Sequence, residues 1–281
     1  NFEEKNSLQF ASHKTHISRL EKEFQSRRKI GFHINLLNGA DLKKQFHLKA
    51  DAALLSYEAA QVDAYLLTHK IFQSITGNGC QVYDHTSITS LKHEKKNIQL
   101  VSQDGYRIRA KYLVVAAGYE SGKYLHKRFE DLRCTYAIVS EPLRDQEIWK
   151  DRSLIWETSD PYLYMRMCDD NRIVIGGKDT AYFRIEKQLS LLPQKAKALQ
   201  KSFGKLFPHL QSIKIDFQWA GAFTSTKDGL PYIGIANLPN TFFALGYGGN
   251  GISFSLIAAR LISGVISGKT SSDLAIFSFN R

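Results

Sequence analysis

The sequence predicts a mixed α/β fold in which an α/β part with a parallel sheet is interrupted by a largely antiparallel β-sheet domain. Two observations predict the α/β part. The run "YLVVAAG" (112–118) is too apolar to have a solvated face, which is typical of a central parallel strand. The run "FFALGYGGNGISFSLIAARLISG" (242–264) predicts a strand, a glycine turn and a helix. A third observation, the change to alternating β-type runs from Arg133 onward, predicts the inserted sheet.

Composition limits the class of protein. Of the 281 residues, 43% are hydrophobic and 12% aromatic, which is enough for a buried core in one large domain or two smaller ones. The cysteines are odd in number, widely spaced and without a C-x-x-C pair, so they predict neither a disulfide framework nor a zinc site. A reducing compartment follows, and we expect a cytoplasmic protein. The cysteines are Cys80, Cys134 and Cys168.

The net charge of +11 suggests an anionic partner. The basic residues do not cluster decisively and no nucleic-acid-binding signature accompanies them, so no specific nucleic-acid binding is expected. No apolar run approaches the length of a transmembrane helix, and the start "NFEEKNSLQF" has neither a signal-peptide core nor an initiating Met. We therefore expect the chain to lack its natural start. The nine histidines show no metal-ligand spacing, and no metal site is predicted.

Periodicity predicts the elements of the first half in order. Apolar residues at helical spacing predict a helix over 13–28, and alternation predicts a strand over 32–36. Asp41 is a plausible N-cap of a short helix. A further amphipathic helix is expected over 62–76, ended by the glycines of "GNG" (77–79).

The remaining runs predict two groups of strands. A small sheet is expected from "CQVYDH", "TSITSLKH", "NIQLVSQ" and "YRIRA". The inserted domain is expected from "CTYAIVSE", "SLIWET", "YLYMRM" and "RIVIGG", then a polar helix over 189–203, then "IKIDFQWAGAF".

The glycine turn contains a dinucleotide-type fingerprint. Gly246, Gly248 and Gly251 match G-x-G-x-x-G, and Asp273 lies 22 positions further on. A first mononucleotide-binding unit would need a second strand after the helix, and Asp273 opens the terminal "DLAIFSFNR" instead of closing a strand. The turn therefore predicts a loop that approaches a ligand at a helix N-terminus, but not the first such loop of a Rossmann fold.

Two other places are candidates for binding. Ala116, Ala117 and Gly118 follow a predicted parallel strand, where ligands bind in open α/β sheets, although a tight turn with nothing bound explains them equally well. Alternation places Arg166 on one face of its strand with Tyr162 and Tyr164. Facing inward, its guanidinium would need an anionic partner such as a substrate carboxylate; facing outward, it would be an ordinary surface residue.

Several segments together resemble the FAD-dependent amine and amino-acid oxidoreductases, which include D-amino-acid oxidase, glycine oxidase and sarcosine oxidase. They occur in the order and spacing of that family and cover most of the chain from about Val62 onward. These segments are "DHTSITSL", "YLVVAAGYES", "PYLYMR", "RIVIGGKDT", "WAGAFTSTKDGLPYIG" and "GYGGNGISFS".

The resemblance implies a role for each candidate residue. Arg166 would bind the substrate carboxylate and Tyr164 would border the substrate cavity. Asp228 and Pro231 match the "DG-P" turn of the family, with a structural role. FAD would be the cofactor, with Ile88 by the adenine and Ala116–Gly118 near the phosphates and ribityl chain. The glycine loop would approach the flavin ring through Gly246, Gly248, Gly249, Asn250, Gly251 and Ile252.

The resemblance also implies a domain plan and one departure from the family. We expect FAD-binding segments over 1–130 and 231–281 and a substrate-binding antiparallel domain over 131–230. The opening βαβ unit of the family, which holds the pyrophosphate of FAD, is not found in this sequence, so the FAD-binding domain is expected to be incomplete at its N-terminus. Either the chain is truncated or the protein is a degraded homologue, and FAD should bind weakly without those contacts.

The expected activity is oxidation of a small amine or amino acid of the glycine, sarcosine or D-amino-acid class, by hydride transfer to FAD from the carbon beside the nitrogen. Oxygen or an electron-transfer partner would accept the electrons. No catalytic side chain is assigned, because an uncharged amine can donate hydride without one. Two alternatives stay open: a related FAD-dependent 2-hydroxy-acid dehydrogenase, and a non-catalytic basic binding module that has lost the cofactor.

Overall fold

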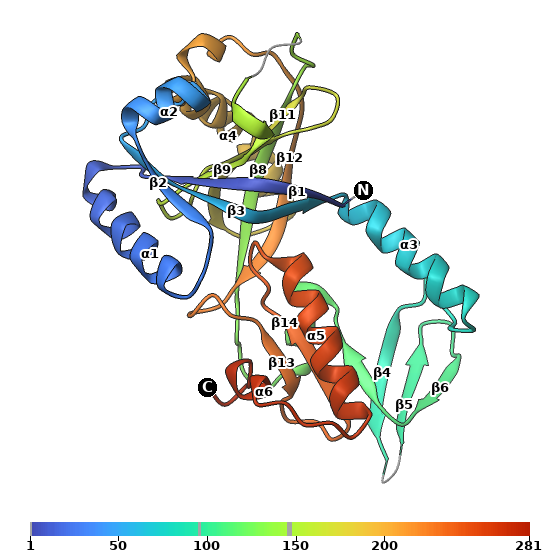
Figure 1. Ribbon diagram of the computed structural model, residues 1–281. Helices are drawn as coiled ribbons and strands as arrows, with labels where there is room; N and C mark the ends of the chain where they lie inside the picture. Colours follow the sequence, from blue (N-terminus) through green and yellow to red (C-terminus); the bar gives the residue numbers. More distant parts are fainter. Residues whose placement is uncertain (1, 95–96, 145–147) are drawn as a thin grey trace. The chain divides into compact units, whose positions relative to one another are not determined.

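A computed structural model of the chain describes residues 2–94, 97–144 and 148–281. The chain forms two compact units (Figure 1). The first unit combines Asn1–Asp63 with Cys134–Ala222, and the second combines Ala64–Arg133 with Phe223–Arg281. Among the described residues, none of the helices is both long and apolar enough to span a membrane.

The first unit contains an eight-stranded sheet in the order β12-β8-β11-β10-β9-β1-β3-β2. Strands β9, β10 and β11 pair antiparallel, as do β1 with β3 and β3 with β2, whereas β1 and β9 are parallel. The strands are β1 (Phe2–Phe10), β2 (Ile34–Asn38), β3 (Ala52–Val62), β8 (Asp131–Ser140), β9 (Leu154–Glu157), β10 (Tyr164–Met167), β11 (Ile173–Ala181) and β12 (Ile215–Ser225).

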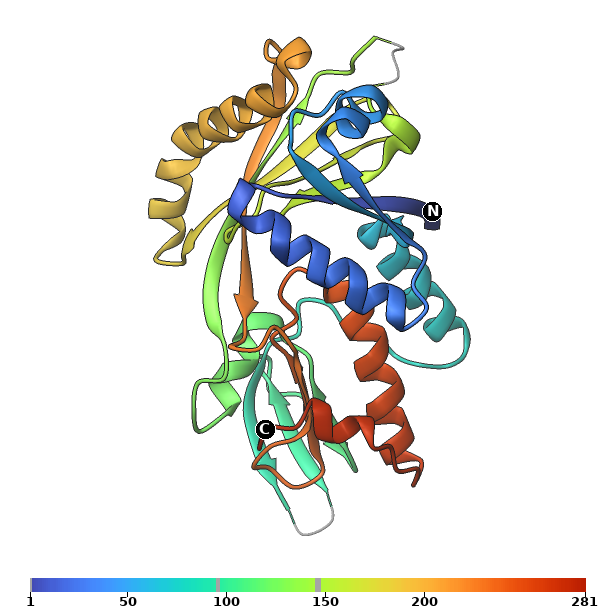
Figure 2. The same ribbon diagram turned by 60° about the vertical axis from the view of Figure 1, so that its left-hand side comes forward.

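Helices cover both faces of this sheet at β3, where alternate residues point to opposite sides. Ala53 and Leu55 join the main core, to which α2 (Gly39–Phe46) and α4 (Ile185–Leu206) also contribute. Leu54, between them, joins a second cluster with Leu20 of α1 (Ile17–Lys29). Figure 2 shows α4 running along the sheet of this unit. The short 3-10 helices η1 (Lys14–His16), η3 (Lys150–Arg152) and η4 (Pro208–Leu210) connect these elements.

The second unit contains two three-stranded sheets, β13-β14-β7 and β4-β5-β6. In the first of them, β14 pairs antiparallel with β13 and parallel with β7. The strands are β4 (Ile88–His93), β5 (Ile98–Ser102), β6 (Arg107–Ala110), β7 (Leu113–Val115), β13 (Tyr232–Ile235) and β14 (Thr241–Leu245). The helices are α3 (Ala64–Gly77), α5 (Gly251–Ile266), α6 (Asp273–Ile276) and the 3-10 helix η2 (Gly118–Tyr124).

Strand β14 is the centre of the second unit, because all five of its residues are buried. Phe242 and Ala244 pack with Ile262 of α5, and Phe243, on the opposite side of the strand, packs with Phe279. A strand apolar on both faces must be covered on both, and here a helix and the C-terminal segment cover it.

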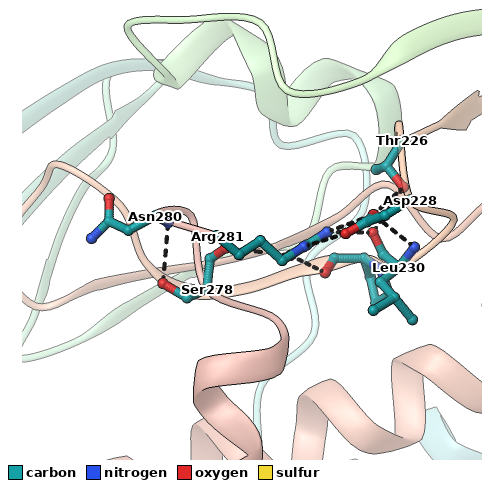
Figure 3. Close-up of polar contacts among 7 residues, drawn as sticks. Thr226, Asp228, Leu230, Ser278, Asn280 and Arg281 are labelled. Atoms are coloured by element: carbon teal, nitrogen blue, oxygen red, sulfur yellow. Dashed lines mark hydrogen bonds and ion pairs between the residues drawn. The ribbon is translucent and has the colours of Figure 1, made fainter.

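The C-terminal residue Arg281 fastens that segment to the "DG-P" turn (Figure 3). Its guanidinium donates from Nε to Asp228 Oδ2 at 2.7 Å and from Nη2 to Asp228 Oδ1 at 3.2 Å. It also donates to the carbonyl oxygens of Leu230 and Pro231 and lies 3.8 Å from the centroid of the Tyr232 ring. The turn therefore has the structural role expected of it.

Most of the predicted helices and strands are present, although some begin or end at other residues and one predicted strand is absent among the described residues. The helix over 62–76 begins at Ala64, and "CQVYDH" is not a strand. The predicted central strand over 112–118 is the short β7, which lies at the edge of its sheet among the described residues. The N-cap of α2 is Asn38, not Asp41.

The domain plan from the sequence differs from the compact units in one respect. Residues 1–63 pack with Cys134–Ala222 and not with the segment that follows them. The reason is strand pairing, because β1 lies between β9 and β3 in one continuous sheet. The expected boundaries at 130/131 and 230/231 lie three and eight residues from the boundaries of the units, which are at 133/134 and 222/223. The assignment of FAD and substrate to these parts stays a prediction.

Candidate functional site

The glycine loop follows β14 directly and adopts conformations that favour glycine. Gly246 and Gly248 have φ of +78° and +56°, in the left-handed region. A Cβ atom at position 246 would lie 2.7 Å from Thr226 Cγ2, so this position has no room for a side chain. The Gly248 N–H donates to the Thr224 carbonyl at 3.1 Å, which fixes the loop to the end of β12.

The start of α5 presents backbone N–H groups without a side-chain cap. Its N-cap residue, Asn250, makes no side-chain capping hydrogen bond, and the first turn contains no acidic residue. Gly249, Asn250 and Ile252 are exposed, and Gly251 is half-buried. The first N–H groups of a helix have no intrahelical partner, and the helix dipole adds positive potential there. This loop and helix start therefore favour an electron-rich group of a ligand.

Parallel pairing of β7 with β14 places two predicted binding segments at the same edge of the sheet. Val115 is opposite Phe243, so residues 116–118 and the glycine loop both follow the carboxyl ends of neighbouring parallel strands. In open α/β sheets, that edge is where ligands bind.

Within 116–118 the backbone groups are not all available. The Ala117 N–H donates to the hydroxyl of the buried Ser121 at 3.1 Å. Gly118, with φ of +55°, begins η2 and has open space where a Cβ would be. Ile88 begins β4 in the other small sheet of the same unit and is half-buried. The placement of Ile88 by the adenine stays a prediction.

Glu130 lies beneath the glycine loop and is a feature that the sequence analysis missed. Its Oε2 atom is buried and has no hydrogen-bond partner among the described residues. A Cβ at position 246 would lie 3.6 Å from this atom. Burial raises the pKa of the Glu130 carboxyl, and the nearby Thr224 side chain and Gly246 backbone offset part of that rise. Nothing in the local sequence "FEDL" distinguishes this carboxylate from its exposed neighbours.

In the first unit, the side chains of β10 alternate between a buried face and a more exposed face of the sheet. Met165 and Met167 are buried in the core, whereas Tyr164 is half-buried and Arg166 is exposed. This alternation is the one that the sequence predicts. Of the two orientations considered for Arg166, the structure has the exposed one, which is the orientation of an ordinary surface arginine, so its role at a substrate stays a prediction from the family resemblance.

Aromatic rings accompany Arg166 on this side of the strand. The ring centroids of Tyr162 and Tyr164 are 5.7 Å apart, and those of Trp156 and Tyr162 are 6.0 Å apart. The Tyr164 hydroxyl lies 3.4 Å from Thr135 Oγ1. Burial raises the pKa of both tyrosines, and the negative charge of Asp179 raises each further. Both phenols therefore stay neutral through neutral pH.

Arg166 itself forms no ion pair or side-chain hydrogen bond with any of the residues that the structure describes. By contrast, the nearby Arg172 is held by Asp170 and Asp216. A guanidinium beside aromatic rings and without a carboxylate of the protein is available for bidentate binding of a ligand carboxylate.

The chain matches the family model described as FAD dependent oxidoreductase over residues 1–264. It belongs to this family, whose cofactor is FAD, and the resemblance stated from the sequence is confirmed. The second unit fits such a group: parallel strand ends meet at one edge, and an uncapped helix with a glycine loop begins there.

Curated relatives are amine and amino-acid oxidoreductases. Gamma-glutamylputrescine oxidoreductase of Escherichia coli (strain K12) is 27% identical over 225 residues, covering 77% of this chain and 50% of that protein. Glycine oxidase of Bacillus subtilis (strain 168) is 25% identical over 236 residues, covering 81% of this chain and 61% of that protein. The chain thus spans about half the length of the first of these two relatives.

Solved structures share the fold. Glycine oxidase from Geobacillus kaustophilus aligns with a TM-score of 0.83 at 19% identity, covering 100% of this chain and 75% of that one. L-proline dehydrogenase from P. horikoshii aligns with a TM-score of 0.81 at 16% identity, covering 99% of this chain and 76% of that one. The predicted mixed α/β fold is confirmed.

Proposed function

We propose that the protein is a flavin-dependent oxidoreductase that oxidises a small amine or amino acid, by hydride transfer from the carbon beside the nitrogen to FAD. Membership of the family supports the cofactor and the reaction class. Relatives named glycine oxidase and D-amino acid dehydrogenase support an amino-acid substrate. The alternative of a 2-hydroxy-acid substrate has no comparable support among the curated relatives described above.

The observation that carries the proposal is the match to the FAD dependent oxidoreductase family over residues 1–264, and Arg166 is assigned to the substrate carboxylate by the family resemblance. An exposed guanidinium next to Tyr164 on a strand face, with no carboxylate partner among the described residues, would bind a substrate carboxylate through two parallel hydrogen bonds. The half-buried Tyr164 would border the remainder of the substrate. Because the pKa of Tyr162 and Tyr164 is raised, neither phenol would become an anion that competes for Arg166.

FAD, when bound, supplies the hydride acceptor. In this chain the N–H groups at the start of α5, around Gly251 and Ile252, would favour negative charge on the ring edge that they face. Ala116–Gly118 would lie near the phosphates and ribityl chain, and Ile88 by the adenine. No side chain is assigned as acid or base, since the neutral amine needs no proton removed by the protein before oxidation.

Two properties of the whole protein belong to the same proposal. Oxygen or an electron-transfer partner would take up the electrons. A cytoplasmic location is proposed on the cysteines, because Cys80 is free and exposed and Cys134 and Cys168 are also free, which suits a reducing compartment.

The test combines flavin spectroscopy with variants of Arg166. The purified chain is incubated with excess FAD, dialysed, and titrated without oxygen with glycine, sarcosine, D-alanine, gamma-glutamylputrescine and lactate while the flavin absorbance is followed. Bleaching by an amine substrate supports the proposal. Bleaching by lactate alone would establish the hydroxy-acid alternative, and a colourless protein retained on polyanions would establish the binding module.

The role of Arg166 is tested by comparing the substrate affinity of Arg166 variants with that of the parent protein. Arg166→Gln should weaken the apparent affinity for the amine substrate about tenfold to a hundredfold, because a charge-assisted bidentate pair is lost, with Arg166→Lys intermediate. Arg19→Gln, at an exposed position of α1, is the matched control and should leave the affinity unchanged. Equal affinities of the parent and of Arg166→Gln would remove Arg166 from the site.

A further inference from the structure

A cavity lies within the first unit and is lined by residues other than those of the candidate site. Its volume is about 830 Å³, and it lies between α2, the segment that follows α2, and η4. Neither Arg166 nor Tyr164 lines it. A cavity of this size falls in the range that accommodates small-molecule ligands.

Two backbone N–H groups around this cavity are already hydrogen-bonded within the protein, so its side chains are the main source of polar groups for a ligand. The Leu48 N–H donates to the Leu42 carbonyl at 3.2 Å, and the Lys49 N–H donates to the Leu206 carbonyl at 2.9 Å. His47 ends α2 in the left-handed conformation, with φ of +53°. This conformation turns the chain sharply and places His47 and Lys49 around the same cavity.

Four of the side chains around the cavity are basic. Lys43 and Lys49 are exposed lysines that form no ion pair with any described residue, and the single acidic side chain is that of Asp51. The rings of His47 and His209 have centroids 5.6 Å apart. Among the described residues no third His, Cys, Asp or Glu joins them in a metal-binding group, so an anion suits the cavity better than a cation.

Part of the lining of the cavity is apolar. Leu48 is 1% exposed and belongs to the main core of the first unit, so it offers almost no surface to a ligand, whereas the half-buried Ala50 packs against that core and is accessible in part. Pro208 completes the apolar lining from η4. A ligand that fits both the interior and the basic groups has an apolar body and a negatively charged head.

We propose that this cavity binds a small organic anion, whose charged head lies between Lys43, Lys49 and the two histidines and whose apolar body lies on Ala50 and Pro208. Binding here is separate from the carboxylate binding proposed for Arg166 and does not depend on it. The head can be a carboxylate or a sulfonate, since the basic side chains recognise charge and hydrogen-bond acceptors.

The binding should depend on pH. Burial and the neighbouring His47 both lower the pKa of His209, so His209 is neutral at pH 7 and above. The other charged groups that face it across the cavity are Lys43, Lys49 and Asp51. A bound anion favours the protonated ring, so the affinity for a permanently charged anion should rise as the pH falls from about 7 toward the lowered pKa of His209.

The test uses benzenesulfonate, which stays charged throughout this pH range, in calorimetric titrations of the full chain. Benzoate replaces the sulfonate head with a carboxylate. Inorganic sulfate has a charged head without the apolar body, and benzyl alcohol has the apolar body without the charge. We expect benzenesulfonate to bind at least about tenfold more tightly than sulfate or benzyl alcohol. Absence of benzenesulfonate binding, or equal binding of benzyl alcohol, would overturn the proposal.

Variants assign the binding to this cavity. Lys43→Gln with Lys49→Gln should weaken benzenesulfonate binding about tenfold or more, because two charge-assisted contacts are lost. Lys197→Gln with Lys201→Gln, at exposed positions of α4 outside the cavity, removes the same charge and should have little effect. His209→Asn should weaken the pH dependence. Equal losses in the two lysine pairs would show a non-specific charge effect and overturn the proposal.

Discussion

Tyr164 and Gly176 face each other across β10 and β11, and the phenol ring of Tyr164 lies where a side chain at position 176 would be. A Cβ atom on residue 176 would lie 2.2 Å from Tyr164 Cζ and 2.3 Å from its hydroxyl oxygen. Glycine at this position therefore lets the tyrosine ring lie flat on the neighbouring strand. The position of a proposed substrate-cavity residue thus depends on a glycine twelve residues away in the β-hairpin.

Gly176→Ala should displace the Tyr164 ring and lower the free energy of unfolding by about 1–3 kcal/mol, because the added methyl group cannot fit without movement of the ring or of the strand. Urea denaturation measures this loss. The double variant with Tyr164→Ala should recover most of it, since the ring that obstructs the methyl is then absent.

Gly221→Ala is the matched control for that prediction, since Gly221 is also a strand residue of the first unit and its added Cβ would come no closer than 4.0 Å to Thr135 Cγ2. We expect it to change the unfolding free energy much less. If Gly176→Ala and Gly221→Ala were equally stable, the close approach of Tyr164 to Gly176 would not be a constraint on the fold.

The ion pair between Asp228 and Arg281 predicts a loss of stability in acid. Hydrogen bonding from Arg281 lowers the pKa of Asp228 from its ordinary 3.8 to about 2. A lowered carboxyl pKa contributes stability above the unfolded value, which is lost as the pH falls through the range from about 4 to about 2. Because Asp228 is half exposed, solvent screening limits the contribution to about 1 kcal/mol.

Asp228→Asn should therefore be less stable than the parent at pH 7 and equally stable near pH 2, as measured by chemical denaturation over this range. Asp104→Asn, an exposed carboxylate of the same unit, is the control. A constant difference between parent and Asp228→Asn at every pH would show that the charge of Asp228 is not what holds Arg281.

The sequence predicts the elements in which apolar residues recur at regular spacing. The strands of the inserted domain were predicted from apolar residues at every second position, and the helix after the glycine loop was predicted from apolar residues at helical spacing. Strands β1 and β3 were not predicted, because "FEEKNSLQF" and "AALLSYEAAQV" contain few β-branched residues. Their conformation comes from pairing with each other and with β9, so tertiary contact overrides local preference.

The residues of the candidate site likewise fall into those that a local sequence pattern predicts and those that it does not. Alternation along β10 is sufficient to place Tyr164 and Arg166 on one face. The contributions of Gly176 and Glu130 depend on neighbours that lie far away in the sequence or across a strand pair, and no local pattern marks them. The cavity around His47 and His209 also joins segments more than a hundred residues apart, which the sequence alone does not bring together.

The capping box of α2 predicts that Asn38, and not Asp41, is the residue that stabilises the start of this helix. The Asn38 side chain accepts hydrogen bonds from the N–H groups of Ala40 and Asp41 at 2.9 and 3.0 Å, and the Asn38 N–H donates to Asp41 Oδ2 at 3.4 Å. Asn38→Ala should cost about 1 kcal/mol of unfolding free energy. Asp41→Ala loses only the longer bond and should cost less, and the reverse order in urea denaturation would restore Asp41 as the cap.

Glu130 predicts the opposite pH dependence from Asp228. Because burial raises its pKa above the ordinary 4.5, the folded protein holds a proton that the unfolded chain has released. Its contribution to stability therefore falls as the pH rises from about 4.5 through the raised value. Glu130→Gln keeps the shape of the side chain and cannot ionise, so it should be at least as stable as the parent at pH 7, and its free energy of unfolding should vary less between pH 4 and 7.

Glu120→Gln, which removes an exposed carboxylate paired with Lys123, is the control and should keep the pH dependence of the parent. If Glu130→Gln were destabilised at pH 7 and kept the slope of the parent, Glu130 would be ionised beneath the glycine loop, and its carboxylate charge would be part of what fixes Gly246.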